Sequence, residues 1–357
     1  MLVRKKIIIY FVIFIILSIF TCFRFWGGHV GDFIVTNYDE LRYLFASDKI
    51  IQDVQTQGVL FTLENFYNYS QSIHFLHYFV LSFFRYIFND SMILWSMWQL
   101  VIYTVGCYYF SKFIRLEYDF ISSNEEIISG ILMLSYPVFY FLTFSLMRDI
   151  AIFTFLSMSL YFYKSNNYKF LLLFVLILSL YRINMMICVL VYIVVDQLKG
   201  KSFSSIMKYL FFSIFVLYII DIVTINFISR HVSRIFDFNF LNIFQEILVF
   251  LFSPLPFSVD QSLPIYLHIW FVFSFGICLF LLFFYFIFVI KTKNIQLILR
   301  FPIICMTLVY IASYSLEFGI GFRQSSIVLP FIYIPIFIYF FKFLFSVKSA
   351  NCIEVDK

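Results

Sequence analysis

Long apolar runs constrain the fold of this chain more than any other feature. Residues 7–23 and 267–290 contain no Asp, Glu, Lys or Arg. A bilayer offers the backbone no water, so only helices and closed barrels can span it, and the run 267–290 lacks the alternation of apolar and polar residues expected of a barrel strand. Since 63% of the 357 residues are hydrophobic and only 13% are charged, the sequence predicts an all-α, polytopic membrane protein.

About ten helices are predicted to cross the membrane, because a crossing needs roughly 20 apolar residues. The candidates after residues 7–23 are residues 73–88, 92–110, 127–147, 150–162, 170–180, 183–195, 210–228, 267–290, 302–316 and 326–345, of which one is expected not to cross. Residues 1–357 are thus predicted to form a single integral membrane domain. Two longer, more polar segments, residues 24–72 and 229–265, are predicted to be extracytoplasmic loops.

Basic residues predict the orientation of these spans. Lys5 and Lys6 place the N-terminus in the cytoplasm, so the first long polar segment is expected outside. Lys291, Lys293 and Arg300 place the loop after residue 290 inside, so the second segment is expected outside as well. An even number of crossings must then lie between the two segments. Seven candidates lie between them, so one does not cross. If residues 73–110 make one net crossing, the basic loops fall inside, as the positive-inside rule favours; if residues 170–195 form one helix instead, several fall outside. The first arrangement is preferred. In the preferred arrangement the basic residues that fall inside are Lys112, Arg115, Lys164, Lys169, Lys199, Lys201 and Lys208.

This arrangement brings charged residues to one face of the membrane. The residues expected at outer span ends or in the first outer loop are Asp39, Glu40, Arg148, Asp149, Arg182, Glu317 and Arg323. An ionised side chain at the bilayer centre costs about 3 kcal/mol on insertion scales, so such residues usually pair or line a water-filled cavity. We therefore expect a shared outer cavity.

The acidic pair Asp39 and Glu40 provides the candidates for a general base. A carboxylate beside a low-dielectric wall can have its pKa raised toward neutrality, where it can accept the proton of an attacking sugar hydroxyl. The alternative is a solvated acidic loop that begins an interfacial helix. The sequence does not decide which of the two residues would act.

Arginines at the outer span ends provide the candidates for binding an anion. Guanidinium groups stay ionised and bind phosphate oxygens through two parallel hydrogen bonds. Arg148, Arg182 and Arg323 are therefore expected to hold a lipid-linked diphosphate. In the structural alternative, Arg148 pairs with Asp149, Arg323 pairs with Glu317, and Arg182 extends to the membrane interface.

Several other classes of function are disfavoured. The chain has no phosphate-binding glycine loop, nucleophile elbow or zinc-protease motif, and its six cysteines lack the close spacing of a zinc site. Its net charge of +5 lies beside apolar runs, so no nucleic-acid partner is expected. No cofactor is predicted, although a divalent metal is left open. Arg230 and Arg234 in the second outer segment are further candidates for substrate binding.

The chain resembles the C-type superfamily of integral-membrane glycosyltransferases and the bacterial O-antigen and capsular polysaccharide polymerases related to it. The matching residues are Tyr38-Asp39-Glu40 with Tyr43 and Ala46, Asn89-Asp90-Ser91, Ser145-Leu146-Met147-Arg148-Asp149 after Tyr136-Pro137, and Gly321-Phe322-Arg323. The resemblance implies transfer of a glycan from a polyprenyl-diphosphate donor in the bacterial cytoplasmic membrane, with Asp39 or Glu40 as the acidic residue of the first outer loop. It also implies that Arg148, Arg182 and Arg323 serve the diphosphate or the glycan. Arg42, Asp149 and Glu317 are further candidates for substrate binding, and a chain-length regulator protein is a candidate partner.

The function expected from this resemblance is polymerisation of lipid-linked repeat units into O-antigen or capsule. Only a short tail follows residue 345, whereas the C-type transferases carry a sizeable soluble C-terminal domain, and this departure favours a polymerase. Two alternatives remain open. One is a transferase that adds a single sugar from a polyprenyl-phosphate donor, and the other is a flippase for lipid-linked oligosaccharides, which would be expected to contain internal repeats.

Overall fold

The computed structural model describes residues 2–26, 28–30, 39–65, 68–69, 75–136, 139, 142–198, 272, 276, 279–280, 283, 300–315 and 326–354. The helices are α1 (Leu2–Phe25), α2 (Asp39–Gln57), α3 (Val59–Glu64), α5 (Leu76–Ile87), α6 (Met92–Glu117), α7 (Ser123–Leu134), α9 (Asp149–Lys164), α10 (Tyr168–Tyr181), α11 (Ile183–Leu198), α16 (Phe301–Ser315) and α18 (Pro330–Glu354). Apart from an isolated bridge between His29 and Ser91, these residues contain no β structure. The predicted all-α class is confirmed.

The chain divides into two compact units. The first unit comprises Met1–Glu117 and Glu126–Met186, and the second comprises Tyr118–Glu125 and Ile187–Lys357. The boundaries fall at the end of α6, within α7 and within α11, and each unit consists of two separate stretches of sequence. The single integral membrane domain expected from the sequence stays a prediction.

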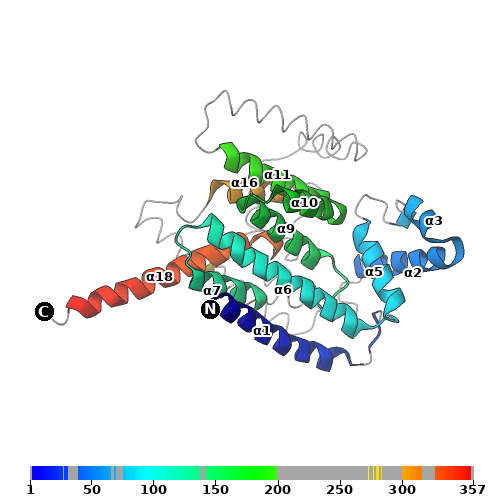
Figure 1. Ribbon diagram of the computed structural model, residues 1–357, viewed down its shortest axis with the longest axis horizontal. Helices are drawn as coiled ribbons and strands as arrows, with labels where there is room; N and C mark the ends of the chain where they lie inside the picture. Colours follow the sequence, from blue (N-terminus) through cyan, green and yellow to red (C-terminus); the bar gives the residue numbers. More distant parts are fainter. Residues whose placement is uncertain are drawn as a thin grey trace. The chain divides into compact units, whose positions relative to one another are not determined.

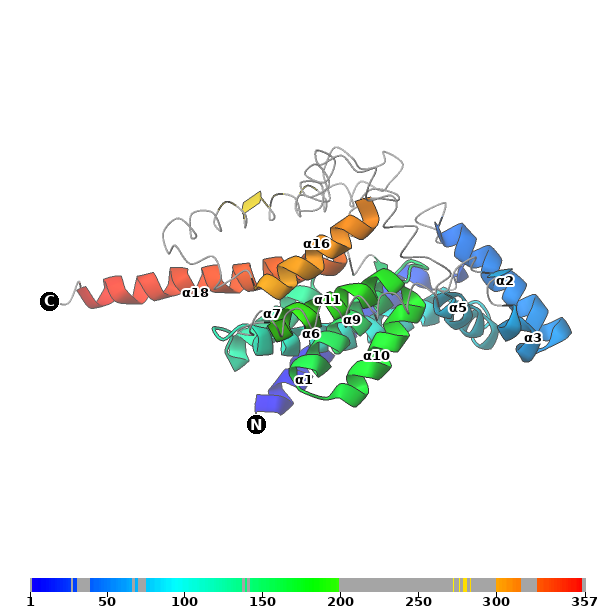
Figure 2. The same ribbon diagram turned by 90° about the horizontal axis from the view of Figure 1, so that it is seen from above.

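Four helices of the first unit follow one another as packed neighbours. The helix α6 packs against α1 and, most extensively, against α9, and α9 packs in turn against α10 (Figure 1). A second group is formed by α2, which contacts both α5 and α3, as the view from above also shows (Figure 2). The helix α10 contacts α5 and thereby connects the two groups.

The close approach of α6 and α9 depends on Gly106. A Cβ atom at this position would collide with the hydroxyl of Thr154 and lie 3.1 Å from the Thr154 Cα atom. The same hydroxyl donates a hydrogen bond to the carbonyl of Ile102 at 3.0 Å. Gly106 therefore lets the backbones of the two helices approach, as small residues do at closely packed helix crossings.

The first predicted loop, residues 24–72, contains the helices α2 and α3. In the first part of α2, up to Ile50, every third or fourth residue is buried, including Glu40, Tyr43, Ser47 and Ile50, which is the spacing of one helical face packed against a partner. The sequence prediction of a loop missed this pattern because the segment carries many charged and polar residues and is not apolar enough for a span. The hypothesis that the acidic pair begins a helix is confirmed, since α2 starts at Asp39.

An arginine ties α2 to the turn between α5 and α6. Arg85 forms ion pairs with Asp48 of α2 at 2.8 Å and with Asp90 of the turn at 2.5 Å. Asn89 and Asp90 both have left-handed backbone conformations, with φ of 48° and 61°, which Asn and Asp tolerate better than other non-glycine residues. The Asn89-Asp90 interruption expected from the sequence is therefore a tight turn between two helices.

The predicted spans agree with the described helices in most places and fail in one. The helix α7 ends at Leu134 and does not continue over residues 127–147; Pro137 follows in the sequence and disfavours helix at the residue before it. The predicted separation of residues 170–180 from 183–195 is confirmed, because Arg182 is extended between α10 and α11. Residues 210–228 and 229–265, and most of 267–290, lie outside the described residues.

None of the helices in the described ranges has both the length and the apolar character that a membrane crossing requires. The membrane-spanning arrangement therefore stays a prediction.

In the second unit, residues 118–125 bind side chains from α18 and from the residue before α16. Arg300 forms an ion pair with Asp119 at 2.7 Å, and Lys342 forms one with Glu125 at 3.2 Å. Burial alone would raise the pKa of the Glu125 carboxyl, but a hydrogen bond from the Ser122 backbone N–H and the charge of Lys342 outweigh it and lower that pKa. The Ser122 contact is one half of a capping box at the start of α7.

Candidate functional site

The candidate site is built around a non-helical segment, residues 145–148, immediately before α9, in which Ser145, Leu146 and Met147 are buried. The hydroxyl of Ser145 donates to the carbonyl of Leu142 at 2.9 Å and accepts a hydrogen bond from the backbone N–H of Met147 at 3.2 Å. Such local bonds from a serine side chain compete with helical hydrogen bonds. They explain why α9 begins only at Asp149 although Leu146 and Met147 are compatible with a helix.

Two side chains from the α2 and α5 group hold the peptide groups of Leu146. The carboxylate of Glu40, which is 0% exposed, accepts a hydrogen bond from the Leu146 backbone N–H at 2.8 Å. The His77 Nε2 atom lies 2.7 Å from the Leu146 carbonyl oxygen. Because a carbonyl oxygen only accepts, Nε2 is the ring nitrogen that carries hydrogen.

Two side chains of α6 bind the neighbouring carbonyls. The indole N–H of Trp95 donates to the carbonyl of Ser145 at 3.0 Å, and the amide N–H of Gln99 donates to the carbonyl of Met147 at 3.5 Å. Within the described ranges, the other amide atom of Gln99, Oε1, is buried and has no hydrogen-bond partner. The segment thus satisfies its backbone groups through side chains of three different helices, as a buried irregular segment must.

Aromatic rings surround His77. The rings of Tyr43, Trp95 and Tyr181 lie 4.8, 6.1 and 6.2 Å from the imidazole, measured between ring centroids. The Tyr43 ring meets the imidazole edge to face at 73°, an arrangement favoured for aromatic pairs. These contacts fix the plane of the imidazole and hence the direction of its hydrogen bond.

The start of α9 and the end of α10 are joined by charged side chains. Arg148 donates from Nη1 to the carbonyl oxygen of Tyr181 at 3.1 Å, and Asp149 forms an ion pair with Arg182 at 3.5 Å. Asp149 and Arg182 are 1% and 7% exposed. The arrangement suits the helix dipoles, because an acid lies at the N-terminus of α9 and a cation lies at the C-terminus of α10.

Four of the residues predicted from the sequence therefore meet at one place, which we call the arginine junction: Glu40, Arg148, Asp149 and Arg182. The ion pair of Asp149 with Arg182 was not among the pairings considered from the sequence. Asp39 is the first residue of α2, and Arg42 is exposed. Arg230, Arg234, Glu317 and Arg323 lie outside the described residues, so their roles stay predictions.

The sequence interpretation missed His77, Trp95, Gln99 and Tyr181. His77 and Gln99 are polar residues inside apolar runs, which is a signal of a buried polar contact that could have selected them. Trp95 and Tyr181 carry no such signal, because aromatic residues are abundant throughout the chain. Tyr181 takes part through its backbone carbonyl, which every residue type offers.

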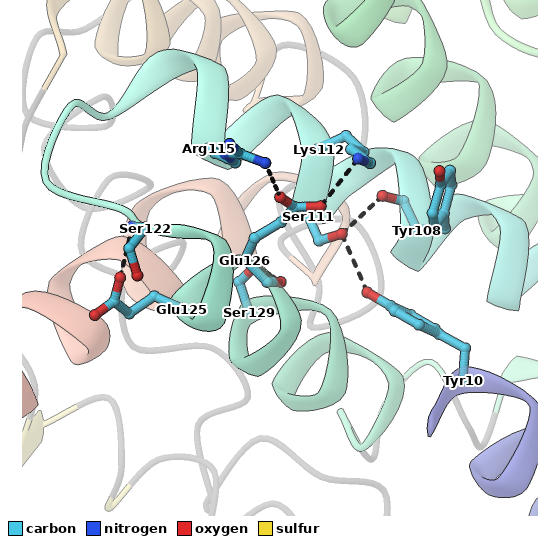
Figure 3. A network of polar contacts seen from close by, with 9 residues as sticks. All are labelled: Tyr10, Tyr108, Ser111, Lys112, Arg115, Ser122, Glu125, Glu126 and Ser129. Carbon is cyan, nitrogen blue, oxygen red and sulfur yellow. Dashed lines mark hydrogen bonds and ion pairs between the residues drawn. The ribbon is translucent and has the colours of Figure 1, made fainter. Parts of the chain in front are cut away.

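A second charged cluster occupies the other end of α6 and α9. Glu126 of α7, which is 1% exposed, binds Lys112 at 3.3 Å and Arg115 at 2.8 Å, and Glu117 binds Lys164 at 2.8 Å. We call these residues the basic end; Figure 3 shows Glu126 between its two cations. Since the N-terminal halves of α6 and α9 border the arginine junction and their C-termini meet here, the two helices run in the same direction.

Beside the basic end, Tyr10 of α1 donates a hydrogen bond to Ser111 of α6 at 3.1 Å (Figure 3). A Cβ atom at Gly130 of α7 would collide with the Tyr10 hydroxyl. Gly130 is thus required for the contact between α1, α6 and α7.

Among the described residues, no group of three or more His, Cys, Asp or Glu side chains is arranged to hold a metal ion. The arginine junction contains two arginines and two carboxylates, and Arg182 is paired with Asp149.

No family model matches the chain, and searches of curated proteins and of solved structures found no similar protein.

Proposed function

We propose that this chain is a multi-pass glycosyltransferase of the bacterial cytoplasmic membrane, a polymerase that joins polyprenyl-diphosphate-linked repeat units into O-antigen or capsule. The observation that carries the proposal is the separation of charge along α9. Arg148 and Asp149 lie at its start and contact residues at the end of α10, whereas Lys164 lies at its end with the basic cluster. The candidate anion site and the basic end are thereby held apart.

This separation supports a membrane orientation. The 16 residues of α9 rise by about 24 Å, which approaches the thickness of a hydrocarbon core. Lys112, Arg115 and Lys164 share the end that the positive-inside rule assigns to the cytoplasm, and the arginine junction is at the opposite end.

Exposed apolar side chains support contact with lipid. On α1, Phe20 and Phe23 are 61% and 82% exposed, and on α10, Leu172 and Leu176 are 62% and 53% exposed. Large exposed apolar surfaces are rare in proteins surrounded by water and mark sites of contact with membranes or partners. Lipid chains would cover them in the proposed arrangement.

The proposed reaction is a displacement at an anomeric carbon. A sugar hydroxyl of one lipid-linked repeat unit attacks the anomeric carbon of the growing chain, and a new glycosidic C–O bond forms. The bond between that carbon and the diphosphate oxygen breaks, and the polyprenyl diphosphate leaves as an anion. The hydroxyl proton passes to a carboxylate of the pair Asp39 and Glu40, and Arg148 and Arg182 stabilise the charge of the leaving diphosphate.

The experiment uses a bacterium from which this gene has been deleted. We expect the deletion to leave surface glycans of a single repeat unit, the native chain to restore long polymers, and Arg148→Gln to lower polymerisation about 100-fold. Arg115→Gln is the matched control, because it removes an arginine at the basic end while Lys112 continues to bind Glu126. It should polymerise as the native chain does when both proteins are present in the membrane in equal amounts.

Other outcomes would replace the proposal. An unchanged distribution of glycan lengths in the deletion strain would exclude polymerisation of that polysaccharide. Glycans that lack one sugar would favour a single-sugar transferase, and lipid-linked repeat units retained on the cytoplasmic face would favour a flippase. If Arg115→Gln lost as much activity as Arg148→Gln, the arginine junction would have no special role.

A further inference from the structure

The N–H and the C=O of Leu146 are both hydrogen-bonded to buried side chains. The Glu40 carboxylate binds its N–H at 2.8 Å, and the His77 imidazole binds its C=O at 2.7 Å. Glu40 lies on α2 and His77 on α5, and these two helices pack against each other. Since neither side chain can shift without disturbing the α2 and α5 pair, the two hydrogen bonds fix the Leu146 peptides as a unit.

The same segment is held from a third helix. Trp95 of α6 binds the Ser145 carbonyl at 3.0 Å, and Gln99 binds that of Met147 at 3.5 Å. Consecutive carbonyls are thus each held by a side chain, and the N–H of Leu146 is held as well, by a side chain from a different helix.

The held segment leads directly to the charged residues of the arginine junction. Arg148 follows Leu146 by two positions and reaches the Tyr181 carbonyl at 3.1 Å, and Asp149 reaches Arg182 at 3.5 Å. A displacement of the Leu146 peptides would therefore shift both arginine contacts.

We propose that Glu40 and His77 are positioning residues: they clamp the peptide groups of Leu146 and thereby hold Arg148, Asp149 and Arg182 in place for the polyprenyl-diphosphate leaving group. This inference rests on the proposed function. It gives the two acids different roles. Glu40 accepts a backbone hydrogen bond, and Asp39 accepts the proton of the attacking hydroxyl.

The geometry argues against Glu40 as the proton acceptor. Its side chain is 0% exposed, and its Oε1 atom already accepts the Leu146 N–H. A general base must come within hydrogen-bond reach of the hydroxyl that it deprotonates. A sugar hydroxyl would have to displace the segment that carries Arg148 to reach this oxygen.

The order of the rates among Glu40 variants distinguishes a positioning role from a role as general base. Glu40→Gln keeps an oxygen that can accept the Leu146 N–H but cannot act as a base, whereas Glu40→Asp keeps a carboxylate but withdraws it by one methylene. We expect Glu40→Ala to lower the rate about 100-fold, as small displacements of catalytic groups do. The rate of Glu40→Gln should be about tenfold higher than that of Glu40→Ala, and the rate of Glu40→Asp should remain close to that of Glu40→Ala. A Glu40→Asp variant more active than Glu40→Gln would overturn the proposal.

His77 offers an independent test of the same clamp. Glutamine places an N–H near the position of the histidine Nε2, so His77→Gln should recover most of the activity that His77→Phe loses. The rate is measured with purified lipid-linked repeat units and with each variant in equal amount. Equal activity of His77→Gln and His77→Phe would overturn the role of the hydrogen bond.

Hydrogen exchange separates failure of the clamp from failure of the proposed function. If the native chain does not lengthen glycans, the polymerase proposal fails, and exchange of the Leu146 amide still tests the clamp in the purified protein. Slow exchange in the native chain and in Glu40→Gln, with faster exchange in Glu40→Ala, supports the clamp. Equal exchange in all three overturns it.

Discussion

The two ends of α6 and α9 use buried acids in different ways. At the basic end, Glu126 lies between Lys112 and Arg115, so a carboxylate that is 1% exposed is compensated by two cations that reach the solvent. At the arginine junction, Glu40 binds a backbone N–H, and the ion pair of Asp149 with Arg182 is almost completely buried. The first arrangement resembles an ordinary ion-pair anchor between helices.

The difference shows how a structural acid can be distinguished from one that shapes a site. Lys112 and Arg115 are 24% and 43% exposed, so they can turn toward water when Glu126 is lost. In the arginine junction, Glu40, Asp149 and Arg182 are 0%, 1% and 7% exposed and have no such freedom. The Glu40 carboxylate also binds an irregular segment. A buried charge that orients an irregular backbone is therefore a stronger indication of function than a buried charge that joins two regular helices.

The largest effect on stability is expected at the arginine junction. Arg182→Met removes a cation that is 7% exposed and leaves the buried Asp149 without its ion pair, which should cost about 3 to 5 kcal/mol of unfolding free energy. Adding Asp149→Asn should restore a large part of this loss. Thermal unfolding of the purified variants measures both effects, and additive losses in the double variant would contradict the coupling.

Loss of the acid at the basic end should cost less. Glu126→Ala leaves Lys112 and Arg115 close together, but both can move into solvent, so we expect a loss of about 2 kcal/mol. The activity per folded molecule should be retained, in contrast to Glu40→Ala. If Glu126→Ala abolished activity without loss of stability, the distinction between the two ends would be wrong.

An overpacking variant tests the helix contact beside the basic end. Gly130→Ala forces the Tyr10 hydroxyl from its position and breaks its bond to Ser111, at an expected cost of about 1 to 2 kcal/mol. Tyr10→Leu shortens the colliding side chain, so adding it to Gly130→Ala should cost less than the sum of the single changes. Unfolding of the three variants measures this coupling.

The smallest effect concerns Glu125, the neighbour of Glu126 in sequence. Because the pKa of the Glu125 carboxyl is lowered in the folded chain, its ionised form stabilises the fold at neutral pH. That contribution disappears as the pH falls below the ordinary glutamate value of 4.5 and through the lowered pKa. Lys342 is 41% exposed, so the contribution should be well below 1 kcal/mol. Glu125→Gln should be less stable than the native chain at pH 7 and approach it under acid conditions.

The sequence predicts regular elements better than it predicts the segment between them. Apolar runs located α5, α6, α9, α10 and α16, because burial of apolar side chains dictates both the run and the helix. The break of α7 before Pro137 was missed, because a run of apolar residues does not reveal where helical hydrogen bonding stops. The start of a helix at Asp39 was considered only as an alternative, and its extent to Gln57 was not predicted, because an amphipathic helix contains no long apolar run.

The candidate site was predictable where charge made it visible. Arg148, Asp149, Arg182 and Glu40 stand out because ionised side chains are rare beside apolar segments. The contacts of Leu146 were not predictable, because they join backbone atoms to side chains far apart in the sequence. His77, for example, is 69 positions from Leu146.

Recognition of backbone atoms at residues 145–147 has a consequence for how this chain can diverge during evolution. Every residue except proline offers the N–H that Glu40 binds, and every residue offers the carbonyls. Leu146 and Met147 are 1% and 0% exposed, so other apolar side chains of similar size should substitute for them. In descendants of this chain, the segment should therefore drift in sequence while the glutamate and histidine that hold it stay constant, and proline should never appear at position 146.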